Sequence, residues 1–537
     1  MMTPIHPLIH PVNDTYLDYL SDESRLSGWA QGIAFPESAE DVISLLSHAS
    51  RAKMSVTISG GRTGLTGASV PRGGLLLSLE KMNRILGAGF DPLKNEWYVR
   101  LQPGVLLKDL NQFLHQTDCR KTATAMAPDI EQNPCCSIAT LPPLFYPPDP
   151  TEETSQIGGN VATNASGART LGFGPTRDYV RSLRIALISG EILDIARGVF
   201  LADENGWFSI SCGNRNLSFP IPGYIMPDTK NTAGYYSRPR MDFIDLFIGS
   251  EGTLGAFTEI ELRLIPMPPH LLAAMFFLPS IADTVRLVRM LREEHIGKMS
   301  APAIPMPQAM EYLDPHALDL LREKRQEDGP CSPIPAFPDL AKASLYCEWF
   351  FKEEETGDRI CGLLEDLLPR AHGSLDNSWA SFDSEGMEKM RILRHAVPET
   401  VNSLIGRIKS AHPGITKLGT DFAVPDAHLE TVVKLYYDTL DASGLKFLLF
   451  GHIGNNHIHA NILPRSQEEY DTGKKIYEKL ALEVIRLGGT VAAEHGIGKL
   501  KKHLLRLMLG ANGMEQMKRI KRAFDPDNLL NPENLFD

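Results

Sequence analysis

The chain of 537 residues is long enough for two to four folding units of about 150 residues each. Hydrophobic residues make up 43% and charged residues 22% of it, which excludes a disordered or fibrous protein. The formal net charge of −12 argues against nucleic acid or an anionic membrane surface as a partner, although it leaves room for a local basic patch.

No secretory signal or membrane-spanning helix is expected from this sequence. The first thirty residues contain four acidic side chains and no long apolar run. The longest uncharged stretch, residues 264–282, contains prolines that would break a spanning helix. Seven cysteines without a C-x-x-C pair suit a reducing cytoplasm and argue against an iron–sulfur cluster held by this chain. The cytoplasm is therefore the expected location.

The first half of the chain alternates predicted helices and strands. Ser38 to Asp41 resembles a capping box and starts a helix that runs to about Arg51. The segments that follow are a β-branched strand at 55–58, a strand at 97–101 and a helix at 107–114. Residues 119–156 are rich in proline and are expected to form a long surface excursion.

A hairpin is predicted over residues 183–195, because two β-branched runs flank Ser189 and Gly190. Residues 200–240 look like a loop. The run 259–264 alternates apolar and polar residues, so it is a strand with one buried face. The prolines that follow mark the best candidate for a domain boundary.

The second half is predicted to be an α+β unit in which helices pack on an antiparallel sheet. Its expected strands are 275–278, 345–351 and 447–450, and its expected helices are 281–294, 358–368 and 429–440. A basic helix at 513–524 precedes a turn-rich tail. The sequence contains no internal repeat or low-complexity tract.

A glycine-rich segment directly after the strand 55–58 is a candidate phosphate site. Backbone N–H groups of such a loop can point inward and bind an anion without a lysine. The segment matches neither the Rossmann G-x-G-x-x-G nor the P-loop pattern, so a nicotinamide domain or a nucleoside triphosphatase is not indicated. A turn without a ligand remains the alternative. The segment consists of Ser59, Gly60, Gly61, Arg62, Thr63, Gly64, Leu65, Thr66 and Gly67.

Two further glycine-rich segments lie at 157–167 and 249–255. The first of these contains Asn160 and Asn164, whose side chains are free to form hydrogen bonds. Three such segments in one part of the chain indicate a long cofactor that stretches across it.

At these residues the sequence resembles the flavoproteins of the vanillyl-alcohol-oxidase type, with a PCMH-type FAD-binding domain. Within them it resembles the FAD-dependent D-2-hydroxyacid dehydrogenases, which include D-lactate dehydrogenase, glycolate oxidase and D-2-hydroxyglutarate dehydrogenase. The resemblance runs from Ser21 to Pro532 and implies that residues 59–67 bind the FAD diphosphate. Further residues that it assigns to FAD are Pro148, Asp149, Gly158, Gly159, Asn160, Thr163, Asn164, Gly167, Glu251, Thr253, Gly255, Ile260 and Asn531.

The resemblance also implies three parts: a two-part FAD-binding domain at 1–267, an α+β ferredoxin-like cap domain with a metal site at 268–510, and a helical segment at 511–537 that returns to the flavin. Arg62 stands where relatives often have glycine. No histidine lies in or beside the two FAD loops where related proteins attach the cofactor covalently, so noncovalent FAD is expected.

Three histidines follow the predicted strand 447–450, at positions 452, 457 and 459. Three imidazoles at a strand end suit Zn²⁺ or a similar divalent ion, with a carboxylate as a further ligand. Glu494 is the candidate carboxylate, and His495 beside it is a candidate base. The pattern lacks the H-E-x-x-H of zinc proteases. Structural histidines and an exposed charge pair remain the alternative reading.

The family pattern implies roles for these residues. His452, His459 and Glu494 match its metal ligands, His495 its base and Asn461 a substrate-side asparagine. His457 stands where relatives usually have asparagine and is a candidate further ligand. Arg394 matches the arginine that binds the substrate carboxylate, and Lys417 matches a later lysine.

The expected function is FAD- and metal-dependent oxidation of a D-2-hydroxy acid, with D-lactate as the first candidate, to the 2-oxo acid. Its electrons would pass to a quinone, a cytochrome, an electron-transferring flavoprotein or a separate iron–sulfur subunit. The expected location is the cytoplasm, and through that acceptor a peripheral location at the inner membrane is the alternative. The alternatives are another flavoenzyme of the same fold, such as an ether-lipid synthase or an oxidase, and a non-catalytic or hydrolytic metal-binding protein.

Overall fold

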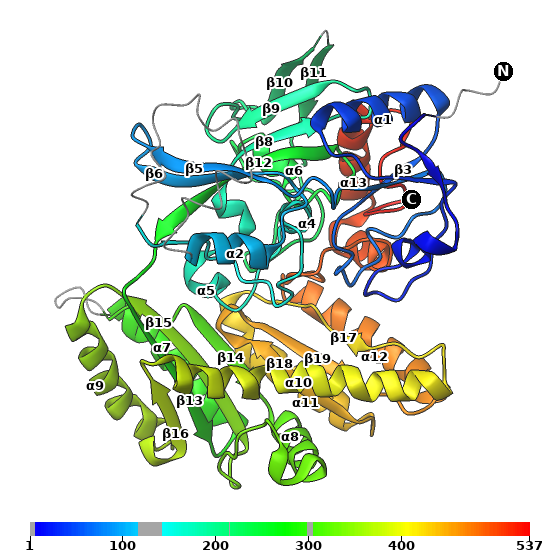
Figure 1. The fold of residues 1–537 in the computed structure, drawn as a ribbon. Coiled ribbons are helices and arrows are strands. Elements are labelled where there is room, and N and C mark those ends of the chain that lie inside the picture. Colours follow the sequence, from blue (N-terminus) through cyan, green and yellow to red (C-terminus); the bar gives the residue numbers. More distant parts are fainter. Residues whose placement is uncertain (1–5, 116–141, 214, 298–303) are drawn as a thin grey trace.

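The computed structural model describes residues 6–115, 142–213, 215–297 and 304–537. Figure 1 shows two halves: the strands up to β12 lie in the upper half, and a large separate sheet lies in the lower half. The proposed division at residues 267–268 falls between β12 and the first strand of that lower sheet.

A small sheet and one helix begin the upper half. The sheet has the order β1-β2-β4-β3, in which β2 and β3 each run parallel to β4. Ser38 accepts a hydrogen bond from the N–H of Asp41 and begins α1, so the predicted capping box is confirmed. The bounds are β1 His10–Pro11, η1 Asp14–Leu20, β2 Gly32–Ala34, α1 Ala39–Ala52, β3 Val56–Ser59 and β4 Leu75–Ser78.

The second sheet of the upper half has the order β5-β6-β12-β8-β9, with β7 also paired to β12. The predicted hairpin is confirmed, since β8 and β9 pair antiparallel. Part of the predicted excursion, residues 116–141, lies outside the described residues. The bounds are β5 Ile85–Asp91, β6 Glu96–Leu101, α2 Leu107–His115, β7 Leu144–Phe145, β8 Val180–Ala186, β9 Ile192–Ala196 and β12 Ala256–Pro266.

Short helices connect these strands. The glycine-rich segment at 157–167 begins with one of them, α4 (Ile157–Thr163), which ends at Asn164 in the left-handed region with φ of 50°. The others are α5 Thr170–Phe173, η4 Thr176–Tyr179 and α6 Ile244–Phe247.

The prediction that residues 200–240 form a loop is wrong in part, because β10 (Trp207–Cys212) and β11 (Arg215–Pro220) form an antiparallel hairpin. Phe208 and Ile210 on the first strand, and Leu217 and Phe219 on the second, alternate with polar residues and are buried. The rings of Phe208 and Phe219 pack against Phe243. This period-two pattern was present in the sequence but is short on each strand.

The lower half contains a seven-stranded sheet of order β16-β13-β15-β14-β18-β19-β17, in which all neighbouring pairs are antiparallel. The predicted antiparallel sheet is therefore confirmed. The bounds are β13 His270–Leu278, β14 Ala309–Leu313, β15 Ala343–Phe351, β16 Ser378–Ser381, β17 Leu418–Gly419, β18 Phe447–His452 and β19 His457–Ile462.

Helices cover both faces of this sheet, and β13 shows the reason. Alternate side chains of β13 enter two different hydrophobic clusters: Ala273 and Met275 enter one, Ala274 and Phe276 the other. The helices are α7 Ile281–Gly297, α8 Pro315–Asp328, α9 Glu354–Arg370, α10 Ser384–Ala411, α11 Leu429–Asp441 and α12 Gln467–Arg486, with short turns η5 Gly329–Cys331, η6 Leu375–Asn377, η7 Asp426–His428 and η8 Ile453–Asn455.

Sequence reasoning missed α8, α10 and α12. The longest of them, α10, has Pro398 in its interior, a residue that normally argues against a helix. Leu393 and Val397 of α10 are fully buried, so packing on the sheet outweighs this local preference. In Figure 1 this yellow helix crosses the lower sheet.

The last helix returns the chain to the upper half. α13 (Lys502–Phe524) is longer than predicted and kinks at Gly510, which has φ of 68°. Beyond it, Leu530 bridges to Val56 of β3 in parallel. The C-terminal residues therefore lie beside the strand that leads into the first glycine-rich segment.

Candidate functional site

The glycine-rich segments surround one cleft in the upper half, with an empty volume of about 890 Å³. The predicted FAD residues that line it are Ser59, Gly60, Gly61, Arg62, Thr63, Gly64, Gly158, Gly159, Asn160, Thr163, Glu251, Gly255 and Asn531. Sequence reasoning did not assign Asp22, Ser69, Pro103, Gln156, Gly252 or Phe257 to FAD, yet these also line the cleft.

Two glycines of the second glycine-rich segment leave space in the cleft for a ligand. A Cβ atom added at Gly159 would meet no atom within 4 Å, so this glycine faces open space in the cleft. A Cβ at Gly158 would lie 2.5 Å from the ring of Pro103, so this glycine allows the segment to approach its neighbour. The segments thus present backbone to a ligand space without side chains in the way.

Arg62 has φ of 59°, a left-handed conformation that explains why glycine suits this position. Its guanidinium lies 4.2 Å from the ring centroid of Tyr19 and 3.8 Å from Glu80. The other predicted FAD residues, Leu65, Thr66, Gly67, Pro148, Asp149, Asn164, Gly167, Thr253 and Ile260, do not line this cleft. Ile260 is fully buried in the sheet, opposite Leu101 and Leu183.

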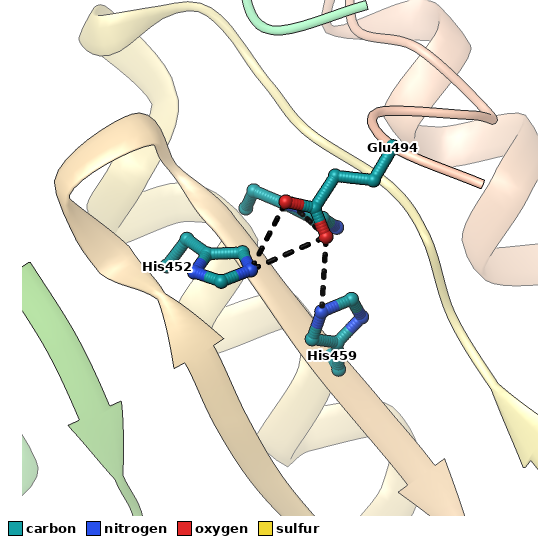
Figure 2. Close-up of side chains that lie close together, drawn as sticks. His452, His459 and Glu494 are labelled. Carbon is teal, nitrogen blue, oxygen red and sulfur yellow. Dashed lines mark hydrogen bonds and ion pairs between the residues drawn. The ribbon is translucent and has the colours of Figure 1, made fainter. Parts of the chain in front are cut away.

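The predicted metal ligands meet in the lower half. His452 ends β18, His457 and His459 lie on β19, and Glu494 lies in the loop after α12. Their ligand atoms all lie within 4.8 Å of one another. Glu494 is 3.1 Å from His452 Nε2 and 4.0 Å from His459 Nε2, as the dashed lines of Figure 2 show.

This cluster is a chemically suitable site for a divalent ion. Imidazole nitrogen and carboxylate oxygen are ligands that Zn²⁺ takes. His457 is buried, with its Nε2 atom 3.2 Å from Oδ1 of Asp421 and its Nδ1 atom 3.9 Å from Glu494. Nδ1 has no hydrogen-bond partner among the described residues, as expected of a site that is completed by another group. Burial lowers the pKa of His459 well below its usual value, so its imidazole is neutral and can ligate a cation.

Charges around the cluster are strongly coupled. Burial lowers the pKa of His452, but Glu311 and Glu494 outweigh it and raise the pKa to about 9. The ammonium of Lys230 pairs with Glu494 and also donates to the carbonyl of Gly167, 3.2 Å away. Lys230 therefore joins the cluster of candidate metal ligands to the second glycine-rich segment.

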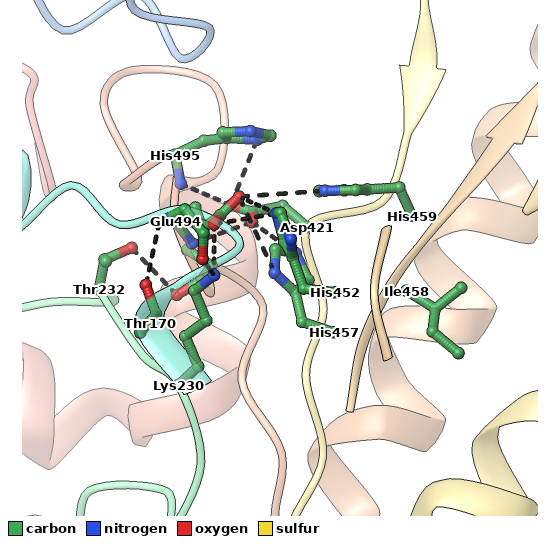
Figure 3. A network of polar contacts seen from close by, with 12 residues as sticks. Thr170, Lys230, Thr232, Asp421, His452, His457, Ile458, His459, Glu494 and His495 are labelled. Carbon is green, nitrogen blue, oxygen red and sulfur yellow. Dashed lines mark hydrogen bonds and ion pairs between the residues drawn. The ribbon is translucent and has the colours of Figure 1, made fainter. Parts of the chain in front are cut away.

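His495 faces the same space as the metal cluster. Its ring stacks at 11° on that of His459, with 5.7 Å between the centroids. Asp421 is fully buried and accepts hydrogen bonds from the N–H groups of Glu494 and His495, both at 3.0 Å, and from Lys501 at 2.7 Å. Figure 3 shows Asp421 among these groups. Burial lowers the pKa of His495, so its ring is neutral and can accept a proton.

Arg394 reaches the site from α10 and is held by two carboxylates. Glu311 and Glu348 lie 3.7 and 3.8 Å from its guanidinium, and the ring of Tyr346 lies beneath it at 4.3 Å. Glu348 also pairs with Arg169 at 2.7 Å. The guanidinium of Arg169 in turn lies 3.8 Å from the carboxylate of Asp149. This chain of charges joins the cap to the predicted FAD residue Asp149, whose pKa burial raises to about 6.

Lys417 and Asn461 lie close together, both beside Gly419 of β17. Lys417 directly precedes β17, which pairs with β19 opposite Asn461. Burial lowers the pKa of Lys417 to about 8, and no ion pair with it is present among the described residues. The Oδ1 atom of Asn461 is buried without a partner in the same part of the structure. Both groups therefore have capacity to bind a ligand.

Five charged residues of the site escaped sequence reasoning: Arg169, Lys230, Glu311, Glu348 and Asp421. The signal for two of them was available, since Glu311 and Glu348 are single carboxylates within otherwise apolar strands. A charge in such a position is rarely tolerated without a partner.

Comparison with known proteins shows the family of this chain. Residues 30–124 and 142–196 match the FAD binding domain family, and residues 267–535 match the family of FAD linked oxidases, C-terminal domain. A D-lactate dehydrogenase of Anaerostipes hadrus is 28% identical over 96% of this chain and 92% of its own length. The glycolate oxidase subunit GlcD of Bacillus subtilis is also 28% identical, over 93% of this chain and 88% of its own.

A solved structure of alkyldihydroxyacetonephosphate synthase shares the fold, with a TM-score of 0.62 at 16% identity over 98% of this chain and 82% of that one. The fold predicted from the sequence, an FAD-binding domain followed by an α+β cap, is thereby confirmed. The chain belongs to the FAD-linked oxidases and is a flavin-dependent oxidoreductase. Across the part of the chain that the structure describes, no helix is both long and apolar enough to cross a membrane.

Proposed function

We propose that this protein oxidises a D-2-hydroxy acid, with D-lactate as the first candidate, to the 2-oxo acid with noncovalent FAD and a divalent ion, Zn²⁺ being favoured by the ligand types. One observation carries the proposal: His495, the partly buried Arg394 and a group of metal-ligand atoms lie in one site, which Lys230 joins to the second glycine-rich segment. The dehydrogenase relatives described above support it.

The residues divide the chemistry between them. Oxidation of R–CH(OH)–COO⁻ removes a proton from the hydroxyl oxygen and a hydride from C2. His495 is the proton acceptor, because its ring is neutral, faces the cluster and keeps 31% of its side chain exposed. Arg394 binds the carboxylate through two parallel hydrogen bonds, and Lys417 supplies a second positive charge.

Two groups from outside the chain complete the site. FAD supplies the acceptor for the hydride. His452, His459 and Glu494 would hold a divalent ion, which would supply Lewis-acid chemistry to lower the pKa of the substrate hydroxyl. Asn461 can accept a hydrogen bond on the substrate side, since its Oδ1 has no partner among the residues described.

A panel assay tests the substrate. D-lactate, L-lactate, glycolate, D-malate and D-2-hydroxyglutarate are supplied with an artificial acceptor dye, with and without a chelator. We expect the D-2-hydroxy acids to be oxidised and the chelator to remove turnover while the flavin absorbance remains. Oxidation of none of these acids, or full turnover after chelation, would contradict the proposal.

A matched pair of histidine variants tests the base. His495→Asn is expected to lower kcat by about 10²- to 10⁴-fold and to leave FAD absorbance unchanged. His503→Asn is the control, because that histidine has a 55% exposed side chain on α13 outside the site. Equal rates in the two variants would exclude His495 as the base.

The electron acceptor is proposed to be a quinone, a cytochrome, an electron-transferring flavoprotein or a separate iron–sulfur subunit, with the protein in the cytoplasm or peripheral at the inner membrane. The likeness to the ether-lipid synthase concerns the fold alone. Product analysis separates the two activities, because a hydroxy acid dehydrogenase releases a 2-oxo acid.

A further inference from the structure

His452 is held by a carboxylate on the strand next to its own. Its Nδ1 atom lies 2.6 Å from Oε1 of Glu311, and its Nε2 atom lies 3.1 Å from Glu494. A histidine that ligates a metal through one ring nitrogen commonly donates the other N–H to an acceptor, which fixes the ring and its tautomer. Glu311 occupies the place of such an acceptor.

The fold explains how Glu311 reaches this position. It lies on β14, whose next residue, Tyr312, is opposite Gly451, the residue before His452 on β18. The neighbouring side chains of β14 are apolar or aromatic and buried, and Glu311 itself is 9% exposed. Burial of a carboxylate in such a strand costs free energy, so its retention calls for a specific role.

We propose that Glu311 is a positioning residue for the metal site. Its carboxylate accepts a hydrogen bond from Nδ1–H of His452 and so directs Nε2 toward Glu494 and the ion. This inference rests on the proposed function, because it assumes that His452 is a metal ligand. The motifs that carry the family resemblance do not include Glu311.

A competing account is that Glu311 only balances the charge of Arg394, from which it lies 3.7 Å away. Glu348 provides the contrast. It is similarly buried and lies 3.8 Å from the same guanidinium, but its other side-chain partners are Arg169 and Tyr346 and not His452. A role in charge balance predicts the same effect from both carboxylates, whereas a role in positioning His452 predicts an effect from Glu311 alone.

The experiment measures the affinity for Zn²⁺ alone, by competition with a chromogenic chelator, on the full-length FAD-loaded protein. Glu311→Ala is expected to weaken Zn²⁺ binding by about a hundredfold. Glu311→Gln is expected to weaken it by only about tenfold, because the amide oxygen of Gln can still accept a hydrogen bond from Nδ1–H of His452. Glu348→Gln is expected to stay within about twofold of the wild type. If Glu311→Ala fails to fold, the comparison of the two glutamine variants carries the test.

A second readout separates positioning from a general structural defect. Excess Zn²⁺ should restore the turnover of Glu311→Gln, whereas a misfolded site would not recover. Equal Zn²⁺ affinity in Glu311→Gln and Glu348→Gln would overturn the inference. A different result would contradict the proposed function itself: wild-type protein that binds Zn²⁺ no better than a His452→Ala variant. The failure of the inference about Glu311 and the failure of the proposed metal site can therefore be told apart.

Discussion

At the scale of single residues, Asp421 connects several parts of the site. It is fully buried and accepts hydrogen bonds from two consecutive N–H groups, those of Glu494 and His495. One carboxylate therefore fixes the backbone that presents both the proposed metal ligand Glu494 and the proposed proton acceptor His495. The ammonium of Lys501 compensates its charge.

Replacement of Asp421 by Asn should leave the Lys501 ammonium buried without its counter-charge. The free energy of unfolding is then expected to fall by about 3 kcal/mol, measured by urea denaturation. The double variant Asp421→Asn with Lys501→Met removes both charges and should be more stable than the single variant. A double variant less stable than Asp421→Asn would show that the pair is not the source of the effect.

Gly159 tests the position of FAD. Its missing Cβ points into open space in the cleft, so Gly159→Leu should fold normally but weaken FAD binding by about tenfold or more. Flavin fluorescence titration of the apoprotein measures this affinity. Gly362→Ala is the control, because Gly362 also has open space around it but lies on the exposed side of α9. Unchanged FAD affinity in Gly159→Leu would place the cofactor elsewhere.

At the scale of elements, the sequence predicts well what is local. The capping box, the β8–β9 hairpin and the strand end that carries His452 depend on neighbouring residues, and the structure has all three. α10 and the β10–β11 hairpin depend on burial against distant elements, and sequence reasoning missed them. The same distinction separates the candidate ligands, which share short motifs, from Glu311, Glu348 and Lys230, which come together only through the fold.

The N-terminus of α8 offers a pH-dependent test. Asp314 caps this helix and is fully buried, and burial raises its pKa to about 7. Its folded-state pKa lies above the unfolded value, so it contributes stability below about pH 4 that is lost as pH rises through about 7. Between pH 5 and pH 7 this should lower the free energy of unfolding by about 2 to 3 kcal/mol.

Asp314→Asn keeps a good capping side chain and cannot ionise. Urea denaturation at pH 5 and pH 7 should therefore show a smaller loss of stability with pH in the variant than in the wild type. Other titrating groups are common to both chains and cancel in the difference. Parallel pH dependence in the two proteins would show that Asp314 is not perturbed as described.

At the scale of the whole molecule, the chain must return to its beginning to complete the FAD cleft. Oδ1 of Asn531 accepts the N–H of Ile58 at 2.7 Å, and its Nδ2 donates to the carbonyl of Glu251 at 2.9 Å. One C-terminal side chain thereby joins the end of β3, directly before the first glycine-rich segment, to the third segment, almost 200 residues away in the sequence. If FAD binds in this cleft as proposed, the long-range closure should link stability to cofactor binding.

Asn531→Ala should therefore lower both the stability of the protein and its affinity for FAD. Loss of the side chain leaves the N–H of Ile58 without its partner, at a cost of about 1 to 3 kcal/mol, whereas the carbonyl of Glu251 keeps its hydrogen bond from Asn534. The rise in Tm that excess FAD produces should be smaller than in the wild type, because that rise depends on affinity. Asn528→Ala is the matched control: Asn528 also has a positive φ, 53° against 40°, but its side chain is exposed. Backbone strain would affect both variants alike, so a reduced response to FAD in Asn531→Ala alone identifies the closure of the cleft as its cause.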